Sequence, residues 1–324
     1  MKYIELPHFP EPQRLSFYLA AEEYVARCLD EEECFFMWQV EPSVIFGRNQ
    51  LIESEVNTEY CKKKNIAVYR RKSGGGCVYA DLSNIMFSYI NTGHSVSYTF
   101  NKYITLVAQA LRKLGVEAYT SGRNDILIGG RKVSGNAFYH LPGRNIVHGT
   151  MLYDTDMENM VGSITPGDAK LVSKGVESVR QHITLLKDHI DMDIESFKRH
   201  IRETLCDGEI VLGDDATAKI RAIEQEYLSP EFIYGNNPAY TVSRRGRIEG
   251  CGDIEARLEI KNGVIKSLNL VGDYFPIGDL DGELLLRLRN VAYTAEAVAE
   301  ALENVRVGDY IRNLSTEQFI QLIL

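Results

Sequence analysis

The chain has 324 residues, six cysteines and a formal net charge of −9. This length can bury the core of one large domain, or of a large and a small one, without structural metals or disulfides. The negative charge favours neither nucleic acid nor an anionic membrane, no stretch reaches the ~18 apolar residues of a membrane span, and no Cys-x-x-Cys pair suggests a zinc site. We therefore expect a cytoplasmic globular protein without nucleic-acid or membrane partners.

The first two thirds of the chain mix helices and strands without regular alternation. Apolar residues at helical spacing predict helices at residues 14–29, 101–114 and 194–205. In the first of these, Glu22 and Glu23 are expected to lie off the apolar face. Short apolar runs predict strands at residues 35–40, 43–46, 67–69, 77–79, 85–89, 125–128 and 150–153. This mixture favours the α+β class over a doubly wound sheet.

The C-terminal part shows a different pattern. Apolar and charged residues alternate over residues 254–260, Asn262-Gly263 supplies a tight turn, and residues 264–271 return, which predicts a β-hairpin. The polar stretch before this hairpin predicts a domain boundary near residue 245. We thus expect a large domain over residues 1–245 and a small α+β domain over residues 246–324.

Helices should follow the hairpin. Residues 282–290 and 294–304 have helical patterns, and a last helix should begin at Ser315. The spacing from Ser315 to Gln318 is typical of a capping box, in which each side chain bonds the backbone of the other residue.

Three successive glycines, Gly74 to Gly76, lie between the basic run 70–72 and a predicted strand. Without Cβ atoms, their amide N–H groups can approach an anion, and the guanidinium of Arg71 can add a fork of charged donors. A flexible glycine loop is the alternative interpretation. The segment is neither a P-loop nor a dinucleotide-binding fingerprint, because it lacks the residues and spacing of both.

A second glycine-rich segment covers residues 121–137. Its apolar run followed by Gly129-Gly130 predicts a hairpin whose returning strand carries Lys132 and Ser134. An ammonium there can hold a substrate carboxylate and stabilise charge that moves onto a phosphate. A single lysine on a strand is more often solvated, so its neighbours must support this interpretation. Further along, His148 is either a general base or a residue that fixes a loop.

Together these segments resemble the lipoate–protein ligase family, in the order and near the spacing of that family. The matching runs lie at residues 46–50, 70–76 with Asp81 and Asn84 beyond, 121–125, 131–135, 148–150 and 174–180. The resemblance implies a catalytic domain of the biotin–lipoate ligase type, with a mixed β-sheet and flanking helices. It also implies the long form of the family, in which a small C-terminal accessory domain moves against the catalytic domain.

The resemblance implies a two-step reaction. Lipoate is activated with ATP and Mg²⁺ to lipoyl-AMP and pyrophosphate, and the lipoyl group then passes to a lysine ε-amine. The implied acceptors are apo lipoyl domains of 2-oxoacid dehydrogenase complexes and the glycine-cleavage carrier protein. The metal ligands stay unassigned.

The resemblance also implies roles for individual residues. The ATP or adenylate site would comprise Arg71, Gly76, Cys77, Val78, Tyr79 and Lys132. The lipoate site would comprise Lys132, Ser73, Gly74 and Gly75. Residues that support the pocket would be Asn84, Asp125, Ser134 and His148. Catalysis is assigned to Lys132.

Three alternatives stay open. An ATP-independent octanoyltransferase or lipoyl amidotransferase of the same fold would use a cysteine, and Cys77 is the candidate. A biotin–protein ligase is disfavoured, because its Gly-Arg-Gly-Arg-x-Gly run is absent. A lipoate-binding regulator would keep the pocket without turnover. Arg71, Lys132 and the additional C-terminal domain favour adenylation.

Overall fold

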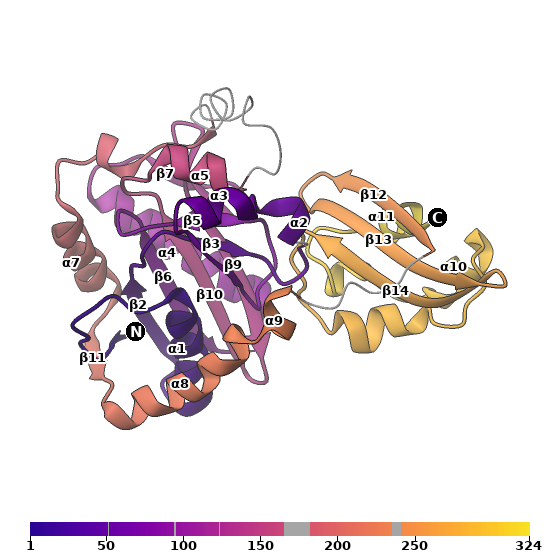
Figure 1. The fold of residues 1–324 in the computed structure, drawn as a ribbon, viewed down its shortest axis with the longest axis horizontal. Coiled ribbons are helices and arrows are strands. Elements are labelled where there is room, and N and C mark those ends of the chain that lie inside the picture. Colours follow the sequence, from indigo (N-terminus) through magenta and orange to yellow (C-terminus); the bar gives the residue numbers. More distant parts are fainter. Residues whose placement is uncertain (51, 94, 123, 165–181, 235–240) are drawn as a thin grey trace.

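The computed structural model describes residues 1–50, 52–93, 95–122, 124–164, 182–234 and 241–324. An eight-stranded mixed sheet forms the frame of the large domain (Figure 1). In spatial order its strands are β11 (Gly208–Val211), β1 (Lys2–Glu5), β2 (Glu33–Trp38), β6 (Ile85–Thr92), β10 (Arg144–Met151), β9 (Arg131–Leu141), β8 (Asp125–Ile128) and β7 (Ala118–Thr120). Strand β1 pairs in parallel with β11 and β2, and the remaining pairs are antiparallel.

Helices cover both faces of this sheet. Successive residues of a strand point to opposite faces, so Phe35 and Phe36 belong to different cores. The core with Phe35 includes residues of α4 (Val96–Lys113) and α7 (Ile194–Leu205). The core with Phe36 includes residues of α1 (Leu15–Cys28) and α8 (Asp214–Leu228). The sheet is thus buried on both sides, which makes it a rigid base for a site.

A second sheet of three strands lies in the same domain. Strand β3 (Ser43–Phe46) pairs in parallel with β4 (Ala67–Arg70) and antiparallel with β5 (Val78–Ala80). Short helices complete this part of the chain: α2 (Ile52–Glu55), α3 (Thr58–Lys63), α5 (Met157–Ile164), η1 (Leu186–Asp188) and α9 (Pro230–Tyr234). The three glycines connect β4 to β5, so both ends of the glycine run are held by strands.

The small domain lies to one side of the large one and has a core of its own (Figure 1). Its antiparallel sheet consists of β12 (Val242–Ile248), β13 (Gly252–Lys261) and β14 (Val264–Gly272). Helical segments pack against the sheet: the π-helical η2 (Leu280–Leu285), α10 (Ala295–Ala301), η3 (Val307–Asp309) and α11 (Thr316–Ile323). The predicted hairpin is confirmed, with positive φ at Asn262 and Gly263 in its turn. The capping box of Ser315 and Gln318 is confirmed as well.

The α+β class and the small C-terminal domain are confirmed, and several bounds differ. The strand expected at residues 150–153 is the end of β10, which begins six residues earlier where polar residues interrupt the apolar pattern. The helix expected at residues 282–290 begins earlier, as the π-helical η2, and continues to Arg287, after which residues 288–290 form a turn. The boundary expected at residue 245 falls inside β12. The predicted motif at residues 174–180 lies outside the described residues.

No helix in the described part of the chain is both long and apolar enough to cross a membrane. The structure describes all six cysteines, and each is a free thiol.

Candidate active site

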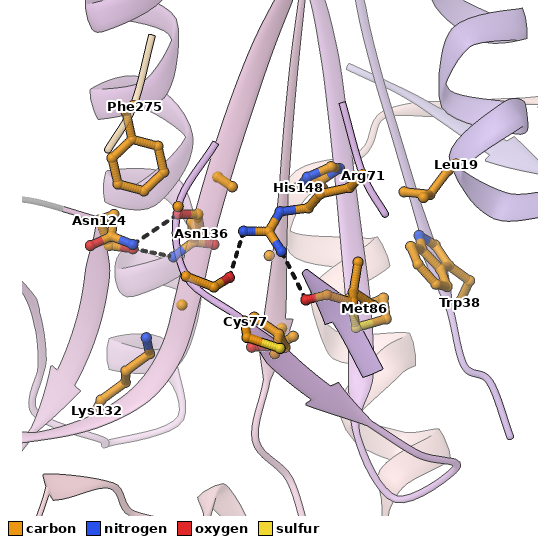
Figure 2. Close-up of a pocket in the computed structure, with 18 residues that line it drawn as sticks. Leu19, Trp38, Arg71, Cys77, Met86, Asn124, Lys132, Asn136, His148 and Phe275 are labelled. Carbon is orange, nitrogen blue, oxygen red and sulfur yellow. Dashed lines mark hydrogen bonds between the residues drawn. The ribbon is translucent and has the colours of Figure 1, made fainter. Parts of the chain in front are cut away.

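A pocket of about 580 Å³, its open mouth included, lies between the glycine run and the large sheet (Figure 2). Apolar side chains from α1, β2 and β6 line one end: Leu19, Trp38 and Met86. Lys132 and Asn124 lie at the other end (Figure 2). A pocket with one apolar and one cationic end suits a long apolar acid whose carboxylate faces Lys132.

The side chain of Arg71 shapes the glycine run from within the protein. Its Nε donates to Ser73 Oγ at 2.9 Å, Nη1 donates to the Ile45 carbonyl at 3.0 Å, and Nη2 donates to the Gly74 and Gly76 carbonyls at 2.7 Å each. Burial lowers the pKa of Arg71 to about 10, so the group still carries its charge at neutral pH. Arg71 lines the pocket, but a direct bond to a phosphate would compete with these contacts.

The small domain reaches the pocket through Phe275 and its neighbours. The ring of Phe275 is 2% exposed, lines the pocket and stacks on Phe138 with centroids 5.6 Å apart. Gly75, at φ +85°, donates its N–H to the Tyr274 carbonyl at 3.1 Å. A Cβ on Gly74 would meet the same carbonyl oxygen at 2.3 Å. These two glycines, expected at the lipoate site, therefore permit close approach of the small domain in this structure.

Lys132 is held at the polar end of the pocket by its own hairpin. The turn between β8 and β9 has positive φ at Gly129 and Gly130, as the sequence predicts. The ammonium of Lys132 lies 2.8 Å from the Asp125 carboxylate. A Cβ on Gly135 would meet Nζ at 2.5 Å, so the lysine side chain lies across this glycine. Asp125 thus orients the lysine from the neighbouring strand.

The remaining expected site residues fall into two groups. Three line the pocket beside Gly75 and Gly76: Cys77, Val78 and His148. Four are buried and do not belong to its lining: Ser73, Tyr79, Asn84 and Ser134. The Asn84 amide oxygen accepts a hydrogen bond from the Thr155 hydroxyl, and Ser134 contacts the Asn136 amide. These contacts hold the surrounding loops and strands together.

The sequence interpretation missed the apolar end of the pocket. Trp38, Leu19 and Met86 are ordinary core residue types on ordinary elements, and no motif marks them. Phe275 was missed because it follows β14 in the other domain. The only local signal was the single tryptophan of the chain, which lies within the strand predicted at residues 35–40.

Family models match both domains. The lipoyl protein ligase A/B catalytic domain matches residues 15–206, and the bacterial lipoate protein ligase C-terminus matches residues 237–323. Fold and site therefore define a two-domain ligase of the lipoyl type, in the long form with a C-terminal domain.

Two relatives extend this match over the whole chain. The chain is 37% identical to lipoate-protein ligase LplJ of Bacillus subtilis, over 94% of this chain and 95% of the relative. It is 33% identical to lipoate–protein ligase 1 of Staphylococcus aureus, over 100% of both chains. The chain belongs to the lipoate–protein ligase family.

Solved structures share the fold. P. falciparum LipL1 in complex with lipoate superposes with a TM-score of 0.78 at 19% identity, over 99% of this chain and 97% of that one. A bipartite ligase from Thermoplasma acidophilum, reported with its E2 lipoyl domain, superposes with a TM-score of 0.66 at 26% identity. The match covers 75% of this chain and 100% of that one. A lipoate-protein ligase A bound with ATP superposes with a TM-score of 0.62 at 25% identity. The match covers 72% of this chain and 99% of that one.

Proposed function

We infer that this protein is an ATP-dependent lipoate–protein ligase. The observation that carries this conclusion is the match of both domains to one ligase family, with relatives at 33–37% identity along the chain. The pocket agrees with it, because an apolar end and a lysine suit the two ends of lipoate. Related structures hold lipoate in one case and ATP in another.

The reaction proceeds in two steps. A carboxylate oxygen of lipoate attacks the α-phosphate of ATP, and the bond to pyrophosphate breaks. The acceptor amine then attacks the acyl carbon of lipoyl-AMP, and AMP leaves. We assign Lys132 to the lipoate carboxylate and to the charge that develops on the phosphate. Gly76, Cys77 and Val78 line the same pocket, and their main chain is proposed to hold the nucleotide.

Mg²⁺ is proposed to enter with the nucleotide. The described residues contain no group of three or more His, Cys, Asp or Glu side chains that could hold a metal ion. Mg²⁺ is commonly bound by one or two carboxylates together with substrate phosphates, so this chain needs no protein cage for it. Asp125 is the carboxylate beside Lys132 at the polar end. The ion would neutralise charge on the phosphates.

The proposed acceptors are apo lipoyl domains of 2-oxoacid dehydrogenase complexes and the apo glycine-cleavage carrier protein. The Thermoplasma relative, reported with an E2 lipoyl domain, supports this choice. We propose that the reaction takes place in the cytoplasm.

The test is the mass of an apo lipoyl domain incubated with the protein, lipoate, ATP and Mg²⁺. One lipoyl group should be added, and omission of ATP should prevent it. Lipoate should also be required for exchange of labelled pyrophosphate into ATP. Acyl transfer without ATP would contradict the proposal in favour of an acyltransferase.

The role of Cys77 distinguishes an ATP-dependent ligase from a cysteine acyltransferase. Burial raises the pKa of the Cys77 thiol to about 12, so the thiol stays protonated and a poor nucleophile at pH 7–8. We predict that Cys77→Ala retains ligase activity within a fewfold. Peptide mass spectrometry after iodoacetamide treatment at pH 8 should find Cys77 much less alkylated than the exposed Cys28. An inactive variant that still binds ATP would restore the cysteine acyltransferase alternative.

A further inference from the structure

Glu22 is a fully buried carboxylate beside the pocket that the reaction as described does not use. It lies on α1 and faces the sheet at the point where Ser88 of β6 and His148 of β10 are direct cross-strand neighbours. Its Oε1 accepts from Ser88 Oγ at 2.6 Å, and its Oε2 lies 2.8 Å from His148 Nδ1. A carboxylate without water is tolerated only when such donors compensate it. The sheet supplies both donors.

A hydrogen-bonded chain leads from Glu22 to the glycine run. His148 Nε2 lies 2.7 Å from Ser73 Oγ, which also receives the Nε–H of Arg71 at 2.9 Å. One arrangement of protons satisfies every group. Ser73 donates its hydroxyl proton to His148 Nε2, and His148 Nδ1–H donates to Glu22. The chain thus runs from the Arg71 cation to the Glu22 anion, and Figure 2 shows His148 and Arg71 side by side.

Glu22 is also connected to the apolar end of the pocket, through Ser88. Trp38, which lines that end, donates its indole N–H to Ser88 Oγ at 2.8 Å, and Ser88 in turn donates to Glu22. The next residue of α1 acts on the same loop, because the buried Glu23 lies 2.7 Å from the ammonium of Lys72. Two successive glutamates of one helix therefore anchor two successive residues, Lys72 and Ser73, at the start of the glycine run.

We propose that Glu22 is a positioning residue of the ligase reaction, which fixes Arg71 and the glycine run through His148 and Ser73. The physical reason is preorganisation. Arg71 holds the carbonyls of Gly74 and Gly76, so a shift of its guanidinium changes the shape of the loop proposed to receive the nucleotide. This inference rests on the proposed function for the part that concerns catalysis.

The test is Glu22→Gln, which preserves shape and removes the charge. The glutamine oxygen can still accept from Ser88, but its NH₂ group would face His148 Nδ1–H. The ring then favours the Nε2–H tautomer, and the buried Ser73 hydroxyl loses its acceptor. We expect ¹⁵N NMR to show this change of tautomer at His148. The kcat of pyrophosphate exchange should fall roughly ten- to a hundredfold, the loss seen when the hydrogen-bond partners of metal ligands are removed from metal sites.

Binding gives a second readout. The chain has a single tryptophan, and it lines the pocket, so Trp38 fluorescence reports lipoate binding directly. We expect the lipoate Kd of Glu22→Gln to change less than threefold while kcat falls. In a variant that is merely unstable, lipoate binding and pyrophosphate exchange would both fall in proportion to the folded fraction.

Glu224 provides a matched control. This carboxylate on α8 is 1% exposed and accepts from Ser16 of α1 at 2.7 Å, but its bonds do not lead to the glycine run. Glu224→Gln should lower the melting temperature about as much as Glu22→Gln and keep exchange within twofold. Equal loss of exchange in both variants would overturn the proposal, because Glu22 would then have a structural role alone.

A double-mutant cycle tests the route. If Glu22 acts through Ser73, the double variant Glu22→Gln/Ser73→Ala should lose no more activity than Ser73→Ala. Additive losses, or an unchanged tautomer of His148, would also overturn the proposal. If the wild-type protein shows no lipoate-dependent exchange, the proposed function fails. The NMR comparison of wild type and Glu22→Gln still decides whether the chain of bonds exists.

Discussion

Replacement of Lys132 by alanine is expected to slow both half-reactions by about 10²–10³-fold while the protein stays folded. Loss of a donor that acts on charge developing in the transition state typically costs about 3–4 kcal/mol. Lys132 is 35% exposed and its partner Asp125 is 27% exposed, so water can solvate the carboxylate that the substitution leaves behind. The fold should therefore tolerate the change.

Pyrophosphate exchange and transfer from chemically made lipoyl-AMP measure the two half-reactions separately. Arg131→Ala is the matched control, because Arg131 is an exposed cation next to Lys132 on β9. That variant should keep both rates within a fewfold, and circular dichroism should show both proteins folded. Near-wild-type turnover of Lys132→Ala would contradict the assignment of catalysis to this lysine.

The position of Lys132 could be predicted because local chemistry determines it. The Gly129-Gly130 turn specifies a hairpin, and the hairpin fixes which strand carries the lysine. The glycine run was equally visible, since three glycines beside basic residues are rare. What the sequence did not reveal was the partner of these glycines, because the Tyr274 carbonyl comes from another domain.

Glu22 and Glu23 show a different limit. Periodicity placed both off the apolar face of their helix, yet both are fully buried. Helical periodicity treats a glutamate as a solvent-facing residue, yet here β6 and β10 supply donors to one carboxylate and Lys72 supplies a cation to the other. Helix α8 was not predicted at all, because its buried positions are few and lie between charged residues. Only tertiary contacts decide such cases.

Removal of the small domain is expected to separate the two half-reactions. A fragment of residues 1–234 keeps the pocket residues of the large domain and ends before β12, so no strand is divided. It loses Phe275, which closes part of the pocket, and the Tyr274 carbonyl that holds Gly75. Adenylation concentrates charge on transferring phosphates and needs water excluded. Aminolysis of lipoyl-AMP begins from an acyl group that is already activated.

The fragment should therefore be soluble, make little lipoyl-AMP from lipoate and ATP, and still transfer the lipoyl group from supplied lipoyl-AMP to an apo lipoyl domain. Adding residues 235–324 as a separate chain should restore part of the adenylation, since the small domain has its own core. The full-length variant Phe275→Ala tests the contribution of this ring apart from that of the rest of the small domain. If the ring alone excludes water, this variant should reproduce much of the adenylation defect. Normal pyrophosphate release by the fragment would contradict the prediction and assign the small domain to another task, such as recognition of the acceptor.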